Sequence, residues 1–175
     1  MTLEEYKIFD LIKFRDHRGY FYESFSRFLN EKLKKDFVQD NISFSKKGVI
    51  RGLHYQRDKP MGKLVHVIDG AIIDHIVDIR KKSKNFGKAF NFHLNSENNK
   101  VLWIPAGYAH GFEALEDSIV VYKCTNFYNK LGEGCINFFD KNLNLNLTID
   151  EKDVIISEKD KKGIAWEEYK SNPKF

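Results

Sequence analysis

The chain has 175 residues, of which 42% are hydrophobic and 14% aromatic, and its formal net charge is +4. This length is sufficient for one domain with a sizeable core, and the aromatic content excludes intrinsic disorder. The mild charge comes without an arginine-rich stripe or a nucleic-acid-binding motif, so it is typical of a solvated surface and predicts no nucleic-acid partner. We interpret residues 1–175 as a single domain.

A short helix is predicted over residues 27–36, RFLNEKLKKD, with Phe28, Leu29 and Leu33 on one side. Most of the chain that follows alternates as β-strands do. In residues 70–80, GAIIDHIVDIR, one face is nearly all apolar, and the other interleaves isoleucines with Asp74 and Asp78, as the wall of a polar pocket would. The Asp-Gly pair at 69–70 lies between two apolar runs and predicts a hairpin.

Further strands are predicted within residues 88–95, 99–115 and 118–128, the second of these ranges containing a Pro/Gly turn. Residues 157–170 predict a loop followed by a short helix. Several short strands joined by turns indicate an all-β antiparallel sandwich or barrel.

The chain carries no signal of export. Cys124 and Cys135 are too few for a disulfide framework and predict reduced thiols in a cytoplasmic protein. Residues 1–14 contain acidic side chains and lack the apolar run of a signal peptide. No stretch approaches the roughly 18 apolar residues of a membrane span, so no membrane association is expected.

The glycine, proline and histidine spacing fits the metal-binding frame of the cupin jelly roll. Its elements are Gly48 five residues before His54, Lys63 six residues before Gly70, and Pro105-x-Gly107-x2-His110. Gln56 stands where the frame has its second histidine, and Lys63 stands where it has a carboxylate. An ammonium offers no lone pair and repels a cation, so the frame predicts no metal site and favours an anion or an oxyanion.

The same residue types suit proton abstraction next to a carbonyl. A neutral histidine is a good base near neutral pH, particularly when a carboxylate orients it. A nearby lysine or arginine stabilises an enolate oxygen, and a tyrosine can exchange a proton from the other side.

The chain resembles the dTDP-4-dehydrorhamnose 3,5-epimerase family over residues 14–166. The matching stretches, in chain order, are FRDHRGYFYESF, VQDNISFSKKGVIRGLHYQ, GKLVHVIDG, DIRKKSKNFGK, LWIPAGYAHGF, VYKCTNFY and ISEKD. The resemblance implies a cupin-type double-sheet jelly roll with a few short peripheral helices. It also implies an epimerase that inverts C3, C5 or both in a nucleotide-linked 4-keto-6-deoxy sugar, through an enolate, for bacterial surface polysaccharides.

The resemblance assigns roles where residues match. It makes His54 the base, Asp160 its carboxylate partner 106 positions away, Lys63 the residue at the enolate oxygen and Tyr128 the acid. The substrate-binding positions that it implies are Arg18, Phe21, Glu23, Gln39, Asn41, Arg51 and His110. Part of the first segment is expected to reach a partner subunit of a homodimer, and neither a metal nor a redox cofactor is expected.

Several alternatives stay open. The segment between Gln56 and Lys63 departs from the family pattern, with an apparent deletion and Met61 before Gly-Lys. GDP or CDP carriers, and a heptose or another deoxysugar, therefore stay open. The other readings are a 3,4-ketoisomerase, a single-centre epimerase, a non-catalytic sugar-binding cupin and a disfavoured metal-dependent oxygenase. His17, His66, His75 and His93 are expected to be structural, and so is Asp78.

Overall fold

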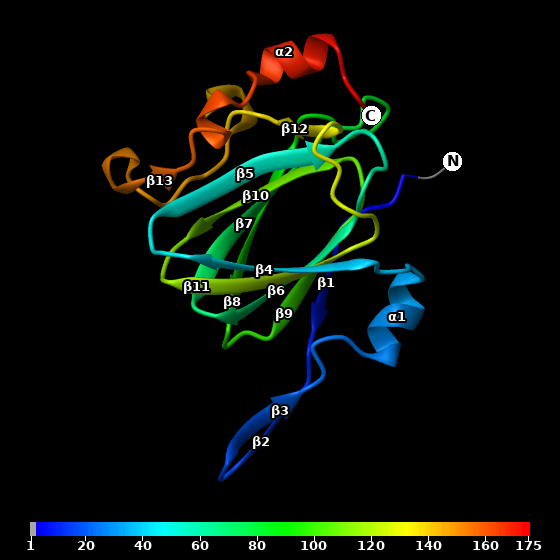
Figure 1. Ribbon diagram of the computed structural model, residues 1–175, viewed down its shortest axis with the longest axis vertical. Coiled ribbons are helices and arrows are strands. Elements are labelled where there is room, and N and C mark those ends of the chain that lie inside the picture. Colours follow the sequence, from blue (N-terminus) through cyan, green and yellow to red (C-terminus); the bar gives the residue numbers. More distant parts are fainter. Residues whose placement is uncertain (1–2) are drawn as a thin grey trace.

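The computed structural model describes residues 3–175, and two facing antiparallel sheets dominate it (Figure 1). One sheet has the order β1-β9-β6-β11-β4, formed by Lys7–Asp10, Lys100–Ile104, Lys63–Asp69, Ser118–Cys124 and Gln39–Ser45. The other has the order β12-β5-β10-β7-β8, formed by Glu133–Cys135, Val49–Gln56, Tyr108–Ala114, Ala71–Asp78 and Ala89–Asn95. β13, Ile155–Ile156, pairs in parallel with β5. The predicted all-β double-sheet class is confirmed.

The space between the sheets is filled by the inward-facing side chains of both. On β7 the alternation places Ile72 and Ile76 in this interior, where neither is exposed to solvent. The side chains that meet them include Val65, Val67, Leu94, Leu102, Ile104, Phe112 and Val120. This core holds the two sheets at a fixed separation, which fixes the distance across any site between them.

The Asp69-Gly70 step is not a hairpin, and that prediction is wrong. β6 pairs with β9 and β11, whereas β7 pairs with β8 and β10 in the other sheet. Gly70 has a φ of 75°, which turns the chain from one sheet to the other. The local signal for a turn was right, but a turn signal does not specify which strand becomes the partner.

The predicted helix is shorter than its sequence pattern. Helix α1 covers Arg27–Leu33 and ends because Lys34 takes a left-handed conformation, with its backbone N–H donating to the carbonyl of Asn30. Leu29 and Leu33 are buried, as positions four apart should be, but Phe28 is 56% exposed. The prediction that Phe28 shares their face is therefore wrong.

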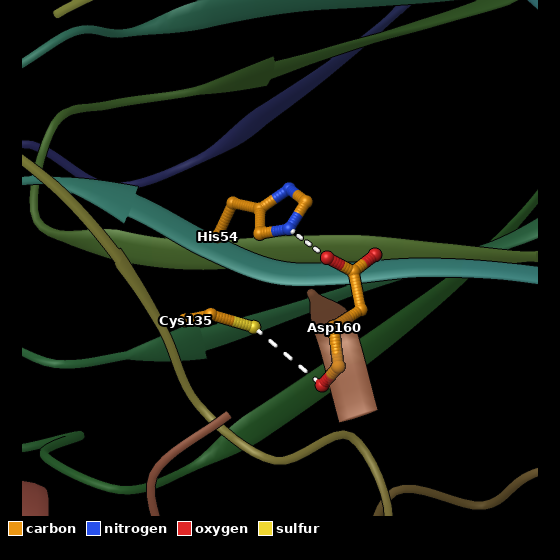
Figure 2. Close-up of side chains that lie close together, drawn as sticks. All are labelled: His54, Cys135 and Asp160. Carbon is orange, nitrogen blue, oxygen red and sulfur yellow. Dashed lines mark hydrogen bonds and ion pairs between the residues drawn. The ribbon is translucent and has the colours of Figure 1, made fainter. Parts of the chain in front are cut away.

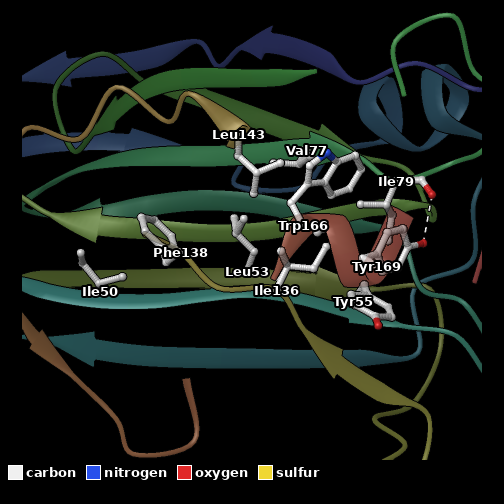
Figure 3. Close-up of a cluster of buried hydrophobic side chains, with 11 residues drawn as sticks. Ile50, Leu53, Tyr55, Val77, Ile79, Ile136, Phe138, Leu143, Trp166 and Tyr169 are labelled. Atoms are coloured by element: carbon white, nitrogen blue, oxygen red, sulfur yellow. Dashed lines mark hydrogen bonds between the residues drawn. The ribbon is translucent and has the colours of Figure 1, made fainter. Parts of the chain in front are cut away.

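The C-terminal segment packs on the outer face of the β5-containing sheet (Figure 3). Trp166 and Tyr169 of helix α2, Trp166–Ser171, lie against the apolar outer side chains of β5 and β7, and the Tyr169 hydroxyl donates to the carbonyl of Ile79 at 3.0 Å. Three short 3-10 helices, η1 (Lys141–Leu143), η2 (Glu151–Asp153) and η3 (Asp160–Lys162), precede it. This packing brings η3 beside β5. The sequence pattern predicted a loop followed by a helix in this region but did not indicate which strand they contact.

A small hairpin extends away from both sheets (Figure 1). It consists of β2, Lys13–Asp16, and β3, Gly19–Tyr22, which pair only with each other among the described strands. We call residues 13–22 the arm. Between residues 3 and 175, no helix has the length and apolar character needed to cross a bilayer.

Candidate active site

A cleft opens between the two sheets and receives polar side chains from both. His54 of β5 and His110 of β10 enter from one sheet, and Lys63 of β6 and Tyr122 of β11 enter from the other. Glu133, Asp160 and Tyr128 complete its rim. Sequence segments more than 100 residues apart therefore converge on one polar cavity.

His54 and Asp160 form a hydrogen-bonded pair (Figure 2). The Nε2 atom of His54 lies 2.8 Å from Oδ1 of Asp160, and the backbone N–H of Gly52 donates to Oδ2 at 3.2 Å. Burial opposes ionisation of Asp160, but the bond and charge of His54 outweigh it and hold the pKa of the carboxyl below its ordinary value. An ionised Asp160 accepts the Nε2 proton, which leaves the lone pair on Nδ1.

Lys63, His110 and Asp74 form a second chain of contacts. The Nζ atom of Lys63 lies 3.3 Å from Nδ1 of His110, and Nε2 of His110 lies 2.8 Å from Oδ2 of Asp74. Burial lowers the pKa of His110, so the ring is neutral and can accept from the ammonium while donating to Asp74. Burial also lowers the pKa of Lys63. Asp74, which the sequence pattern placed on the wall of a polar pocket, is buried behind the cleft and supports His110.

Tyr128 lies at the exposed rim with its hydroxyl already engaged. It donates to Oε2 of Glu133 at 2.8 Å, and Lys159 donates to the same oxygen at 2.6 Å. This hydrogen bond, with some burial, raises the pKa of Tyr128, which is 52% exposed. The backbone N–H of Tyr128 donates to Gln39, which places that predicted binding residue at the same rim.

Tyr122 is a site residue that the sequence reasoning missed. It belongs to β11, so it faces the cleft from the sheet opposite His54, and it is more buried than Tyr128. Burial, with the nearby Cys124, raises the pKa of its phenol and keeps it protonated. The sequence did contain a signal for Tyr122. It lies on the same face of the strand as the inward-facing Val120 and Cys124, so its phenol is a polar group aimed at the interior.

The predicted binding residues fall into two groups. Asn41 and Gln39 of β4 line the cleft and are hydrogen-bonded to each other at 2.9 Å, while Arg51 of β5 lines its far part and donates to Ser45 at 3.0 Å. Arg18 and Phe21 lie on the arm, and Glu23 follows it; none of the three lines this cleft. Phe21 is 67% exposed.

Gln56, which stands where the cupin frame has its second histidine, is hydrogen-bonded to neighbouring backbone. Its amide donates to the carbonyls of Lys59 and Phe127 at 2.6 and 3.1 Å and accepts from the backbone N–H of Asn129 at 2.8 Å. It thereby fastens the shortened 57–62 segment to the 127–129 segment. With Gln56 and Lys63 so committed, the cupin frame retains its spacing but not its ligand set.

Two other expected structural residues lie apart from the cleft. His75 is fully buried, with Nε2 at 2.9 Å from Glu113 and Nδ1 at 2.7 Å from Asn91. Asp78 is buried against Arg80, with Oδ2 accepting from Nη2 at 2.6 Å. His75 links β7 to β8 and β10, whereas Asp78 anchors the loop that follows β7 through Arg80 and Ser83, and neither contact involves the cleft.

Comparison with known proteins decides the family. The sequence model described as dTDP-4-dehydrorhamnose 3,5-epimerase matches residues 1–168. The dTDP-4-dehydrorhamnose 3,5-epimerase of Methanothermobacter thermautotrophicus is 43% identical over 166 residues, which cover 93% of this chain and 88% of the relative. The chain belongs to this family. Its cupin-type fold follows from the same finding.

Solved structures of two further proteins resemble this member of the epimerase family. The dTDP-6-deoxy-D-glucose-3,5-epimerase of Legionella pneumophila, in complex with dTDP-4-keto-L-rhamnose, superposes with a TM-score of 0.88 at 41% identity, covering 94% of this chain and 89% of that one. A 3'-monoepimerase from Streptomyces bikiniensis, in complex with dTDP-quinovose, gives a TM-score of 0.89 at 25% identity, covering 98% and 88%. The family fold therefore accommodates both double and single inversion.

Proposed function

We propose that this chain inverts C3 and C5 of a dTDP-linked 4-keto-6-deoxyhexose, in the supply of deoxysugars for surface polysaccharides. The observation that carries the proposal is the His54–Asp160 pair, which faces Tyr122 across a cleft that also holds a half-buried lysine, Lys63. A base and an acid on opposite sides of a sugar ring are what inversion requires. The dTDP carrier is supported by the family and by the dTDP sugars bound in its structural relatives.

His54 is the proposed base, acting through Nδ1. The C4 ketone acidifies the hydrogens at C3 and C5, because the electron pair left by either proton delocalises into an enolate. Asp160 fixes the tautomer and then stabilises the imidazolium, so proton removal does not leave an isolated charge in a partly buried place. Base catalysis of this kind contributes about 10²–10⁴-fold to the rate.

Lys63 is proposed to stabilise the enolate oxygen. Its ammonium lies in a partly buried environment, where an oxyanion gains more from a positive charge than it would in water. His110 accepts from the ammonium and so holds Nζ in place, and Asp74 in turn holds His110. The charge of Lys63 is thereby positioned before the reaction begins.

Tyr122 is our proposal for the acid that returns the proton. It stands on the sheet opposite His54, and its phenol is kept protonated by burial. Tyr128, the acid implied by the resemblance, is proposed instead to shape the rim, because its hydroxyl donates to Glu133. The two assignments are distinguished by mutation: inversion should stop in Tyr122→Phe if Tyr122 is the acid, and in Tyr128→Phe if Tyr128 is the acid.

A single-centre epimerase is the second candidate. The Streptomyces 3'-monoepimerase shares the fold, so the fold does not fix the number of inverted centres. Double inversion requires the sugar to present C3 and then C5 to His54. The shortened 57–62 segment, with Met61 at the cleft wall, is where we expect such repositioning to be controlled.

Incubation in D2O with dTDP-, GDP- and CDP-linked 4-keto-6-deoxyhexoses, followed by NMR of the ring positions, tests the proposal. Deuterium at both C3 and C5 with the dTDP sugar is the expected result, and deuterium at one position selects the single-centre reading. His54→Ala should abolish exchange. Absence of exchange with every sugar for the unmodified protein would refute epimerase activity.

We further propose that the protein is a homodimer of one-domain subunits in the cytoplasm. The arm exposes Phe14, Tyr20 and Phe21 at 60, 52 and 67%, a set of apolar side chains better explained by a partner subunit than by water. In such a dimer Arg18 and Phe21 would complete the partner's cleft. Analytical ultracentrifugation of the protein and of a Phe14→Glu/Phe21→Glu variant tests this, the variant being expected to dissociate.

A further inference from the structure

The pairing of β12 with β5 places Cys135 beside His54, the proposed base. Cys135 of β12 is directly opposite His54 of β5 in the antiparallel register, and such cross-strand neighbours have Cβ atoms about 4.5–5.5 Å apart on one face. Asp160 reaches the same point from η3. The ligand atoms of these three side chains all lie within 4.8 Å of one another (Figure 2).

We propose that His54, Cys135 and Asp160 form a Zn²⁺ site that holds the enzyme inactive. The donor set combines an imidazole, a thiol and a carboxylate, which suits zinc and leaves a fourth position for water. The Asp160 side chain is only 6% exposed, so this carboxylate is not a surface charge of the kind that rarely binds metal. The site is separate from the cupin frame, whose Gln56 and Lys63 are committed elsewhere.

The thiol is free to move toward a cation. Its contacts are long and weak, at 3.7 Å to the carbonyls of Gly52 and Ile136 and 4.0 Å to that of Asp160. Tetrahedral zinc with bonds of about 2.0–2.3 Å separates its ligand atoms by about 3.3–3.6 Å. Binding therefore requires the 2.8 Å bond between His54 and Asp160 to open slightly and Sγ to approach by side-chain rotation.

Occupancy of this site removes the base. Zinc takes the Nε2 lone pair of His54, so the ring proton moves to Nδ1, the atom proposed to accept the sugar's proton. The Cys135 thiol gives up its proton to solvent as the Zn–S bond forms, so binding releases one proton and changes no oxidation state. Burial, with Asp160 nearby, raises the pKa of Cys135 to about 12, which keeps the metal-free thiol protonated.

Metal binding is tested without reference to activity. Co²⁺ is titrated into the full chain and into Cys135→Ala and Cys135→Ser, with Cys124→Ala as the matched control because Cys124 is the other free thiol. One equivalent should give a thiolate-to-cobalt charge-transfer band in the unmodified protein and in Cys124→Ala. Both Cys135 variants should lack it and bind Zn²⁺ on the order of 100-fold more weakly by calorimetry.

The inhibitory role rests on the proposed epimerase function, and its test keeps the two apart. Stoichiometric Zn²⁺ should stop deuterium exchange in the unmodified enzyme, EDTA should restore it, and Cys135→Ala should keep its exchange in zinc. A missing charge-transfer band, or one that survives in Cys135→Ala, overturns the site. Exchange that continues in zinc-loaded enzyme overturns the inhibition. A band in a protein that exchanges no sugar proton supports the site and refutes the epimerase function.

Discussion

Asp160→Asn isolates the role of the carboxylate with almost no change in shape. The aspartate accepts two hydrogen bonds, from His54 at one oxygen and from the backbone N–H of Gly52 at the other. An asparagine has one oxygen. If that oxygen keeps His54, the amide NH₂ opposes the Gly52 N–H, which costs about 1–3 kcal/mol for unsatisfied donors.

If the amide turns the other way, its NH₂ faces Nε2 of His54. The ring then carries its proton on Nδ1 and cannot act as the base. Either orientation also removes the negative charge that stabilises the imidazolium, so we expect kcat to fall by about 10³–10⁴-fold with KM nearly unchanged.

The assay is NMR-detected deuterium exchange at C3 and C5, with initial rates measured over a range of substrate concentrations. Glu158→Gln is the matched control, because it removes a neighbouring carboxylate whose only described partner is exposed Lys161, at 2.7 Å. Its rate should stay within about twofold of the unmodified enzyme. An Asp160→Asn variant that keeps more than about a tenth of the activity would show that His54 needs no carboxylate to act.

Three further outcomes are expected. Lys63→Met should lower kcat by about 10²–10³-fold in the same assay, and an effect confined to KM would contradict its role at the enolate. Tyr122→Phe should retain exchange of the abstracted proton but lose inversion, whereas Tyr128→Phe should invert at a measurable rate; the reverse pattern would restore Tyr128 as the acid. Glu113→Gln should lower the free energy of unfolding by about 1–3 kcal/mol at about pH 7. The His75 bond, overcoming burial, holds the pKa of Glu113 below its unfolded value of 4.5. That stabilisation is therefore present above about pH 4.5 and lost as pH falls through the folded pKa. The free energy of unfolding of the variant, measured in urea, should therefore depend less on pH in the acid range than that of the unmodified protein.

Local patterns predicted the strands but not their partners. The alternation of residues 70–80 placed Ile72, Asp74 and Ile76 on one face of the strand, and that face lies between the sheets, with Asp74 buried behind His110. The same pattern suggested a hairpin at Gly70, because alternation reports which face is buried and not which sheet a strand joins. Pairing depends on contacts distant in sequence, which no window of neighbouring residues contains.

The candidate site was likewise only partly predictable from local sequence patterns. His54 and His110 could be selected by spacing, but Asp160 could be named only through the family, because a carboxylate in a charged tail has no local mark of function. Tyr122 was overlooked in favour of Tyr128, since both lie in one aromatic run and only the sheet assignment separates an inward-facing side chain from a rim side chain.

The division of the site between two sheets explains why a small barrel suits inversion. The proposed base, His54, is fixed to β5, and the proposed acid, Tyr122, is fixed to β11 in the facing sheet. Their separation is set by the close-packed core around Ile72 and Ile76, which resists compression and expansion. In the proposed reaction, a planar enolate held between these two sheets meets a proton donor on the face opposite to the one that lost its proton, so the architecture favours inversion.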